Sequence, residues 1–241
     1  MSGPAGSSQL LFSDNLEYQI EHSLKFDGVT NSKIHRTPGS AGSARIGTFS
    51  AWVKKLKQGA FQQVFAAGDA TTDTVELLFR NNDQILLTAA VGNAAKITLK
   101  TQGTAANRAK LYVNGVIQSD FETANYPDQN QDLDISQAVE HMIGVNVSNN
   151  NNLNGYIAEV NFIDGLALAP TSFGVTDSTY GHWKPIQYTG AYGTNGFHLD
   201  FNDAGNLGDD AAGGTDFTET NVVANDQMLD SPTNTFPVLN H

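Results

Sequence analysis

The stretch Val75-Glu-Leu-Leu-Phe-Arg-Asn-Asn-Asp-Gln-Ile-Leu-Leu87 contains two short apolar runs on either side of a polar turn. Asn and Asp favour turns because their side chains bond to their own backbone, so residues 81–83 predict a hairpin. Upstream, Phe49-Ser-Ala-Trp-Val-Lys54 has apolar residues at its odd positions, which is the period of a strand with one buried face, and Phe61-Gln-Gln-Val-Phe65 follows it. No long 3.6-residue period is present. The pattern therefore predicts an all-β protein.

Three Asn-Gly pairs mark the expected ends of further strands. Both residues of such a pair tolerate a positive φ, which a type I′ hairpin turn requires. Asn114-Gly115 follows the run 109–113, Asn154-Gly155 precedes Tyr156–Phe162, and Asn195-Gly196 precedes Phe197–Phe201. Strands at this spacing, joined by Gly, Asn and Asp turns, predict a two-sheet antiparallel β-sandwich. The only helical pieces that we expect are short, at Ser136–His141 and Pro170–Gly174.

The composition limits the class of protein. At 241 residues the chain can hold one large all-β domain, and a fold of this length buries enough surface to need no disulfide or metal support. It has no cysteine, which excludes a disulfide framework and cysteine-based zinc or thiol chemistry. Its net charge of −12, from 13 basic and 25 acidic residues, repels phosphate backbones. We therefore expect no nucleic-acid partner.

We expect three segments along the chain: an N-terminal arm at 1–20, a sandwich at 21–167, and a loop-rich C-terminal extension at 168–241. The extension should pack on the sandwich, either by lying across it or by adding edge strands, and should not form a core of its own. The first residues, Met1–Gln9, are small and polar, without the basic start and apolar stretch of a signal peptide. The longest apolar run, Ile85–Val91, is too short to span a bilayer. We therefore expect no membrane insertion, and release from the cell by lysis or as part of a particle.

Four pieces of the predicted sandwich occur in the same order in a known family. They are Leu24-Lys-Phe-Asp-Gly28, Thr48-Phe-Ser-Ala-Trp-Val-Lys54, Leu111-Tyr-Val-Asn-Gly115 and Asn154-Gly-Tyr-Ile-Ala-Glu-Val160. Together they resemble the laminin-G-like branch of the concanavalin-A-like lectin and glucanase superfamily. The resemblance implies a jelly-roll sandwich over residues 24–167. Relatives carry a Trp-His or Trp-Tyr-His strand before the third piece, whereas here Ile97–Lys100 passes directly into a loop. We therefore expect that strand to be either shortened or replaced by Ala89–Leu99.

The C-terminal extension carries a second resemblance. Its pieces are Asn161-Phe-Ile-Asp-Gly165, Ser172-Phe-Gly174, Tyr188–Phe197, Leu199-Asp-Phe201 and Asp230-Ser-Pro-Thr-Asn234. They are similar to an extension found on such domains in tailed-bacteriophage structural proteins of the tail, fibre or decoration type. The resemblance implies a non-catalytic virion protein that mediates assembly or surface attachment, is assembled in the host cytoplasm and is released by lysis. The implied partners are other virion proteins and copies of the chain itself, with a trimer favoured by tail or capsid symmetry.

The sequence contains no recognisable catalytic pattern. A retaining glycosidase needs two carboxylates about 5–5.5 Å apart, and the laminarinase-type Glu-x-Asp-x-x-Glu pattern is absent. Glu159 stands alone with Asn161 two residues on, so a carboxylate on the sheet surface or in a structural hydrogen bond is the simpler interpretation. The six histidines show no metal spacing, and there is no Gly-x-Ser-x-Gly elbow. We predict that the protein is not an enzyme. A glycan depolymerase with an unrecognised site is the enzymatic alternative.

Calcium is the one cofactor that the sequence raises. Asp200-Phe-Asn-Asp-Ala-Gly-Asn206 and Asp209-Asp210 are rich in oxygen ligands. As an EF-hand loop, however, this region has Ala204 at position five and Ala211 at position twelve, where ligands are needed. Clustered Asp and Asn also form turns through bonds to their own backbone. We therefore expect turns here, and we predict no metal and no cofactor.

The candidate binding residues are aromatic side chains of the extension. Sugar or partner recognition uses exposed rings beside amides and carboxylates, and the extension offers Tyr180, His182, Trp183, Tyr188 and Tyr192. Aromatic rings also bury large areas, so the same five could pin the extension onto the sandwich, which is the interpretation we favour. If the rings face solvent instead, the protein is a lectin that recognises a host surface polysaccharide as its receptor.

Overall fold

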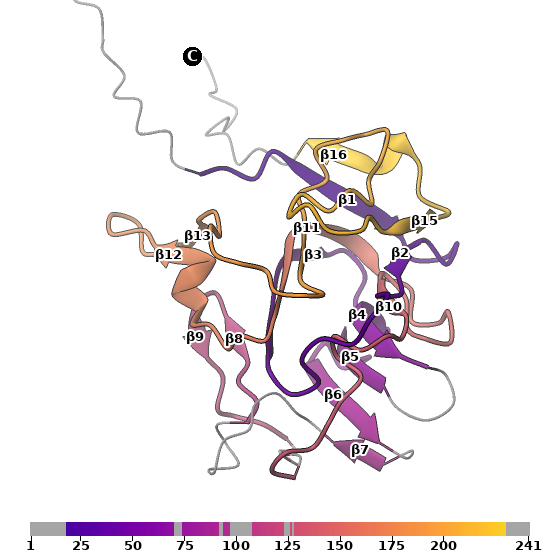
Figure 1. Ribbon diagram of the computed structural model, residues 1–241. Coiled ribbons are helices and arrows are strands. Elements are labelled where there is room, and N and C mark those ends of the chain that lie inside the picture. Colours follow the sequence, from indigo (N-terminus) through magenta and orange to yellow (C-terminus); the bar gives the residue numbers. More distant parts are fainter. Residues whose placement is uncertain are drawn as a thin grey trace, which may run out of the picture.

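Two antiparallel sheets pack face to face in the computed structural model and form an all-β sandwich, as the sequence predicts (Figure 1). The structure describes residues 18–69, 74–91, 94–96, 108–122, 126 and 128–229. Within these residues the helical pieces are two 3-10 turns, η2 (Pro170–Ser172) and η3 (Ala224–Asp226). None of the described segments forms a helix long and apolar enough to cross a membrane.

The first sheet, here called sheet A, is organised around its longest strand, β11 (Asn154–Asp164). One edge of β11 pairs with β3 (Gly47–Lys55). The other edge pairs with β1 (His22–Asp27) at one end and with β14 (Phe197–Leu199) at the other. β16 (Gln227–Leu229) pairs with the free edge of β1. Because successive side chains of a strand point to opposite faces, the partly buried Phe49, Ala51 and Val53 of β3 pack against the core, and the residues between them face the other side.

The second sheet, sheet B, has the strand order β15 (Thr218–Thr220), β2 (Lys33–Arg36), β10 (His141–Ile143), β4 (Gln62–Gly68), β5 (Thr74–Phe79), β6 (Ile85–Val91) and β7 (Ala94–Lys96). β5 and β6 form the hairpin predicted around residues 81–83, and Asp83 adopts a φ of 65° in its turn. Two small hairpins lie outside both sheets: β8 (Tyr112–Val113) with β9 (Val116–Ile117), and β12 (Gly174–Thr176) with β13 (Trp183–Pro185).

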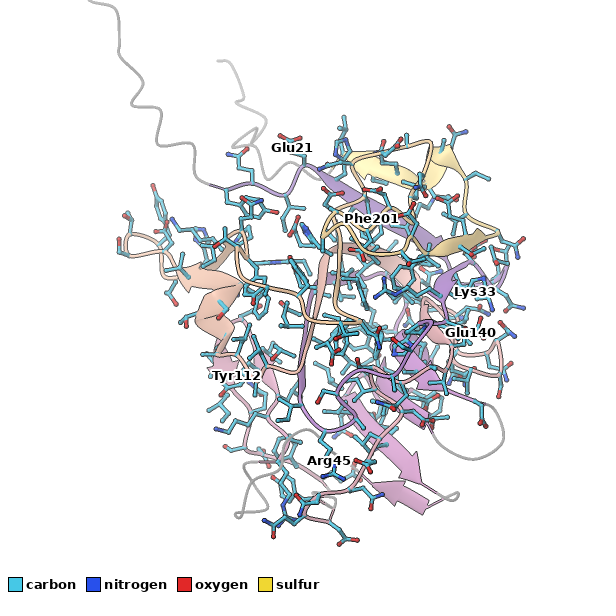
Figure 2. All side chains as sticks on the ribbon, in the orientation of Figure 1. Glu21, Lys33, Arg45, Tyr112, Glu140 and Phe201 are labelled. Atoms are coloured by element: carbon cyan, nitrogen blue, oxygen red, sulfur yellow. The ribbon has the colours of Figure 1, made fainter. Side chains whose placement is uncertain are left out.

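The core lies between the two sheets, where side chains fill the space (Figure 2). Sheet A contributes Leu24, Phe26, Ile157, Val160, Phe162, Phe197 and Leu199, and sheet B contributes Ile34, Val64, Phe65, Ala67, Val75, Ala89 and Ile143. Phe65 and Phe162 stack across the interface with ring centroids 6.3 Å apart. Burial of each large apolar side chain stabilises the fold by roughly 1.5–3 kcal/mol, so this layer holds the sheets together.

The C-terminal extension is built into both sheets. After residue 168 the chain adds β14 and β16 to sheet A and β15 to sheet B. Phe217 and Val222 of the same segment lie in the core between the sheets. At the other end of the chain, Ile20 is also buried. Residues 1–17, the segment 97–107 and the piece Asp230–Asn234 lie outside the described residues, so the expectations for them stay untested.

One of the three predicted Asn-Gly turns is confirmed. Asn114 and Gly115 join β8 to β9 with φ values of 49° and 76°, as a type I′ turn requires. Asn154 and Gly155, in contrast, lie inside β11. Gly155 packs so closely on β3 that a Cβ there would lie 2.2 Å from the carbonyl oxygen of Lys54. Glycine is needed here for a close approach of two strands, so the prediction of a turn is wrong.

The prediction for Asn195 and Gly196 is wrong for the same reason. This pair forms a bend before β14, and neither residue has a positive φ. A Cβ on Gly196 would lie 1.9 Å from the carbonyl oxygen of Tyr192, so the glycine again permits close backbone packing. Asn195 is buried, and its side-chain amide donates hydrogen bonds to two backbone carbonyls at 2.8 Å.

The two predicted helical pieces have different outcomes. Pro170–Ser172 forms the 3-10 turn η2, and β12 begins at Gly174. Residues 136–140 are irregular, so the prediction of a short helix there is wrong. The side chain of His141 holds this segment in turns, because one ring nitrogen accepts a hydrogen bond from the Ser136 backbone N–H at 3.1 Å and the other donates to the Val139 carbonyl at 2.8 Å.

Candidate functional site

The five aromatic residues proposed for binding do not gather in one place. The structure divides them among the end of the β12–β13 hairpin, the contact between the two small hairpins and the outer face of sheet A. Their exposure differs accordingly.

Tyr180 and His182 lie at the solvent-exposed end of the β12–β13 hairpin. Tyr180 is 80% exposed, and its ring stacks on the His182 imidazole with centroids 6.1 Å apart and planes inclined by 22°. Asp177 holds the loop, because its carboxylate accepts hydrogen bonds from the backbone N–H groups of Thr179 and Tyr180, both at 2.8 Å. The N–H of Gly181 closes the turn onto the carbonyl of Asp177 at 2.9 Å. The pair thus presents rings to solvent from an ordered loop.

Trp183 is packed between the two small hairpins. Its ring lies so close to Gly115 and Gly174 that a Cβ on either glycine would come within 2.4 Å of it. Gly115 belongs to the turn of β8–β9, and Gly174 begins β12. The indole therefore joins the hairpins to each other.

Tyr192 lies on the outer face of sheet A, and Tyr188 packs beside it. Asn161 lies between the core residues Val160 and Phe162 on β11, so its side chain points away from the core. The hydroxyl of Tyr192 donates a 2.7 Å hydrogen bond to the side-chain oxygen of Asn161. Tyr188 packs edge-on against Tyr192 with ring centroids 5.2 Å apart. Tyr192 therefore bonds the extension to the sandwich, and Tyr188 packs against Tyr192 and, on the other side, against Phe173.

A buried Glu–His pair lies beside these rings. His198 is opposite Asn161 in the pairing of β14 with β11, and its Nε2 lies 3.0 Å from a carboxylate oxygen of Glu159. The ring of Tyr192 stacks on the imidazole with centroids 6.0 Å apart. The hydroxyl of Tyr18 also bonds to the Glu159 carboxylate. Because the His198 and Glu159 side chains are only 11% and 9% exposed, the pair is largely shielded from solvent.

The backbone at Glu159 explains how its side chain reaches this pair. Glu159 has a φ of 48°, and the register of β11 against β3 shifts between Ala158 and Asn161. Such a β-bulge turns a side chain toward a new direction. A left-handed φ on a residue other than glycine costs of order 1–3 kcal/mol. The hydrogen bonds made by the redirected carboxylate offset this cost.

The electrostatics of the cluster favour the protonated form of His198. Burial lowers the pKa of His198, but the hydrogen bond to Glu159 and the negative charges of Glu159 and Asp200 outweigh burial and raise the pKa above its usual value. Burial, together with the neighbouring Glu159, raises the pKa of Tyr18 and of Tyr192, so both remain hydrogen-bond donors. The Glu159 carboxylate is thus held from two sides. This arrangement fastens Tyr18 and β14 to sheet A.

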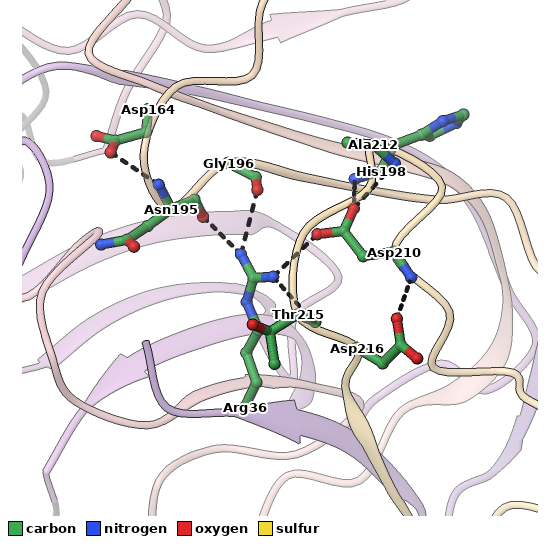
Figure 3. Close-up of polar contacts among 9 residues, drawn as sticks. All are labelled: Arg36, Asp164, Asn195, Gly196, His198, Asp210, Ala212, Thr215 and Asp216. Carbon is green, nitrogen blue, oxygen red and sulfur yellow. Dashed lines mark hydrogen bonds and ion pairs between the residues drawn. The ribbon is translucent and has the colours of Figure 1, made fainter. Parts of the chain in front are cut away.

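A second buried polar cluster is centred on Arg36 at the end of β2 (Figure 3). Its guanidinium lies 3.0 Å from the carboxylate of Asp210, and the two side chains are 8% and 0% exposed. The guanidinium also donates hydrogen bonds to the backbone carbonyls of Asn195, Gly196 and Thr215. A planar group with several donors in fixed directions suits this set of acceptors, which a lysine could not bind simultaneously.

Aromatic rings complete the Arg36 cluster. The guanidinium carbon lies 5.0 Å from the ring centroid of Phe197 and 4.7 Å from that of Phe217. Asp210 also accepts hydrogen bonds from the backbone N–H groups of His198 and Ala212. Every one of these partners comes from the extension, whereas Arg36 belongs to sheet B. The cluster is therefore a structural junction between the extension and the sandwich.

The Asp- and Asn-rich region forms turns. The carboxylates of Asp200 and Asp203 accept hydrogen bonds from backbone N–H groups two residues further on, at 3.0 and 2.8 Å. Asp216 accepts a hydrogen bond from the N–H of Asp210 at 3.1 Å. Within the part of the chain that the structure describes, no group of three or more His, Cys, Asp or Glu side chains is placed to hold a metal ion.

An apolar cavity of about 720 Å³ opens between β3 of sheet A and β4–β6 of sheet B, beside the two hairpins. Its walls include Phe49, Val53, Leu77, Phe79 and Trp183. Among the described residues that line it, none is Asp, Glu or His. The titratable side chains in its described lining are Lys110 and Tyr112.

Most residues of these clusters were not indicated by the sequence. His198 occupies the middle of the apolar run Phe-His-Leu, and a polar residue at such a position is the one local sign of the Glu159 pair. Arg36 and Tyr18 carried no such sign. No protein-family model, no curated protein and no solved structure matches this chain. The resemblances to laminin-G-like domains and to phage extensions therefore rest on the quoted sequence pieces alone.

Proposed function

We propose that the protein is a non-catalytic structural component of a tailed-bacteriophage virion, and that it mediates assembly or surface attachment through a lectin-like β-sandwich. The pieces that resemble laminin-G-like domains, and those that resemble the phage extension, support this proposal. The two-sheet fold is compatible with both. Because such sandwiches host many functions, the fold alone does not indicate the function, and the support has to come from the surface of the molecule.

The observation that carries the proposal is a pair of hairpins with exposed apolar side chains. Figure 1 shows β8–β9 and β12–β13 next to each other on one side of the molecule, and Trp183 packs between them. On the first hairpin Val116 and Ile117 are 63% and 51% exposed, and on the second Val175 is 42% exposed. These side chains lie on two hairpins that Trp183 joins, and exposed apolar groups on neighbouring elements offer a surface for contact with another protein. We call these three side chains the hairpin surface, and it suits contact with a neighbouring protein.

The non-catalytic part of the proposal rests on how the buried acids are used. A glycosidase needs two carboxylates that reach the substrate, about 5–5.5 Å apart in retaining enzymes. Glu159 is held by His198 and Tyr18 with little exposure, and Asp210 is fully buried against Arg36. Both carboxylates stabilise the junction of the extension with the sandwich. A depolymerase would have to use other acids, and incubation with host polysaccharide followed by a reducing-end assay tests that alternative.

The proposed partners are other virion proteins and further copies of this chain. Parts of a virion meet tail or capsid symmetry as closed oligomers, and a trimer fits this requirement. The hairpin surface is the part of the described chain that we assign to such contacts. Light scattering of the purified protein measures its oligomeric state.

Cryo-electron microscopy of particles that carry this chain tests the proposal. We expect density for the sandwich in repeated copies, with the hairpin surface against neighbouring subunits or at an outer attachment surface. The double variant Val116→Asp, Ile117→Asp should be incorporated poorly, since two buried charges oppose the contact. Val29→Asp, at a turn residue that is 74% exposed, is the matched control and should be incorporated normally. Purified particles without this chain would contradict the proposal.

A further inference from the structure

We propose that Tyr180 and His182 form a stacking site for a pyranose ring of a neutral glycan at the end of the β12–β13 hairpin. This inference deepens the attachment part of the proposed function and rests on it. It assigns a ligand class to two residues of the extension and separates them from the three aromatic residues that are packed.

The first support is that the pair is exposed without a folding reason. Tyr180 is 80% exposed, whereas Trp183 packs against both hairpins, Tyr192 bonds to Asn161 of the sandwich, and Tyr188 packs between Phe173 and Tyr192. Burial of an aromatic ring contributes to stability, and Tyr180 makes almost no such contribution. A large ring left in solvent on an ordered loop is therefore available to a ligand.

The second support is that the loop is held in one shape. Asp177 binds the backbone N–H groups of Thr179 and Tyr180 through one carboxylate oxygen, and its other oxygen lies 3.2 Å from Nζ of Lys184. Its backbone N–H donates to the carbonyl of His182 at 2.8 Å. A preorganised site loses less entropy when the ligand binds, so the loop geometry favours binding.

The size and chemistry of the site favour a sugar over a protein. A stable protein interface buries about 800 Å² on each partner, which the six-residue tip 177–182 cannot supply by itself. One face of a pyranose ring exposes C–H groups, and these pack against the electron-rich face of an aromatic ring. Ser178 and Thr179 are exposed next to the rings, so their hydroxyls are available to sugar hydroxyls.

The charge of the site favours a neutral sugar. The backbone N–H groups of Tyr180 and Thr179, with Lys184, lower the pKa of Asp177 to about 2, so its carboxylate stays ionised. The positive charge of Lys184 is paired with this carboxylate. Since the chain as a whole carries −12, an acidic polysaccharide would be repelled.

A glycan array with the full chain tests the inference. Because one stacked ring binds weakly, the protein is displayed on multivalent beads so that avidity raises the signal. We expect binding to neutral glycans, a loss of at least about tenfold in Tyr180→Ala, and near-normal binding in Tyr180→Phe, which keeps the ring. Val29→Ala is the matched exposed control and should bind as the wild type does. Equal unfolding midpoints establish that the variants are folded.

Three results would overturn the inference: no binding to neutral glycans, binding to acidic glycans alone, or unchanged binding in Tyr180→Ala. Cryo-electron microscopy separates this failure from failure of the proposed function. If the chain is present in particles but Tyr180 is covered by a neighbouring subunit, the virion proposal stands and the sugar site does not. If a neutral glycan binds through Tyr180 but the chain is absent from particles, the virion proposal fails and the sugar site stands.

Discussion

Replacement of Arg36 by alanine is expected to loosen the C-terminal extension from the sandwich. Arg36 belongs to β2, and its partners Asp210, Asn195, Gly196 and Thr215 all belong to the extension. The variant therefore removes a junction between two parts of the chain that are far apart in sequence. The strands of sheet B keep their own hydrogen bonds, so the loss of stability should be confined to the contact between the extension and the sandwich.

The magnitude follows from the contacts that disappear. Removal of one partner from a buried ion pair costs about 3–5 kcal/mol, because the other charge stays buried. Asp210 keeps its hydrogen bonds to two backbone N–H groups, at 2.9 and 3.1 Å, which favours the lower end of this range. Loss of the donors to three carbonyls, partly replaced by water, adds about 1 kcal/mol. We expect the free energy of unfolding to fall by about 4 kcal/mol, and the melting temperature by roughly 8–16 °C for a chain of this size.

Urea unfolding followed by tryptophan fluorescence measures this loss. Arg36→Lys keeps the charge without the planar set of donors and should lie between Arg36→Ala and the wild type. Arg45→Ala is the matched control, because Arg45 pairs with Asp132 on the surface, where the side chains are 41% and 65% exposed. We expect no measurable change in that control. An Arg36→Ala midpoint equal to that of Arg45→Ala would refute the reasoning.

Three further predictions concern other parts of the fold. Burial lowers the pKa of His141 to about 4, below the value of about 6.5 in the unfolded chain. The neutral His141 side chain therefore contributes its full stabilisation of the fold above about pH 6.5, and up to about 3 kcal/mol of this stabilisation is lost as the pH falls toward 4. Urea midpoints between pH 7 and 4 should show this loss, and a His141→Gln variant should show less of it. Gly174→Ala places a Cβ 2.4 Å from the Trp183 ring, so it should lower the free energy of unfolding by about 1–3 kcal/mol and shift the indole emission. Gly39→Ala is the control, because the space around Gly39 is open, and it should change neither the free energy of unfolding nor the emission. Tyr192→Phe loses a 2.7 Å hydrogen bond to the outer face of β11 and should lower the unfolding free energy by about 1–2 kcal/mol, and an unchanged thermal midpoint would contradict this.

The strands of the fold were largely predictable because strand formation follows a local pattern. The alternating run Phe49–Lys54 lies within β3, and the polar residues 81–83 form the turn between β5 and β6. Asn-Gly pairs were a weaker guide. Glycine serves either a positive φ, as at Gly115, or a close approach of two backbones, as at Gly155 and Gly196, and only the packed structure distinguishes these uses.

The candidate site was predictable as a set of residue types and not as an arrangement. The sequence pointed to five aromatic residues but had no means to separate exposed Tyr180 from Tyr192, because both roles use the same ring chemistry. The pairing of Glu159 with His198 joins residues 39 positions apart through the register of β11 against β14. A local pattern carries no such register.

By itself the sequence determined the all-β class, the position of most strands, the absence of cysteine chemistry and the strongly acidic charge, because each depends on composition or on neighbours along the chain. The tertiary structure alone decided which glycines turn the chain, which rings reach solvent and which charges meet. Arg36 and Asp210 lie 174 residues apart and become a buried pair only when the extension adds its strands to both sheets. Burial and pairing depend on every element that packs around a group, so no stretch of sequence encodes them separately.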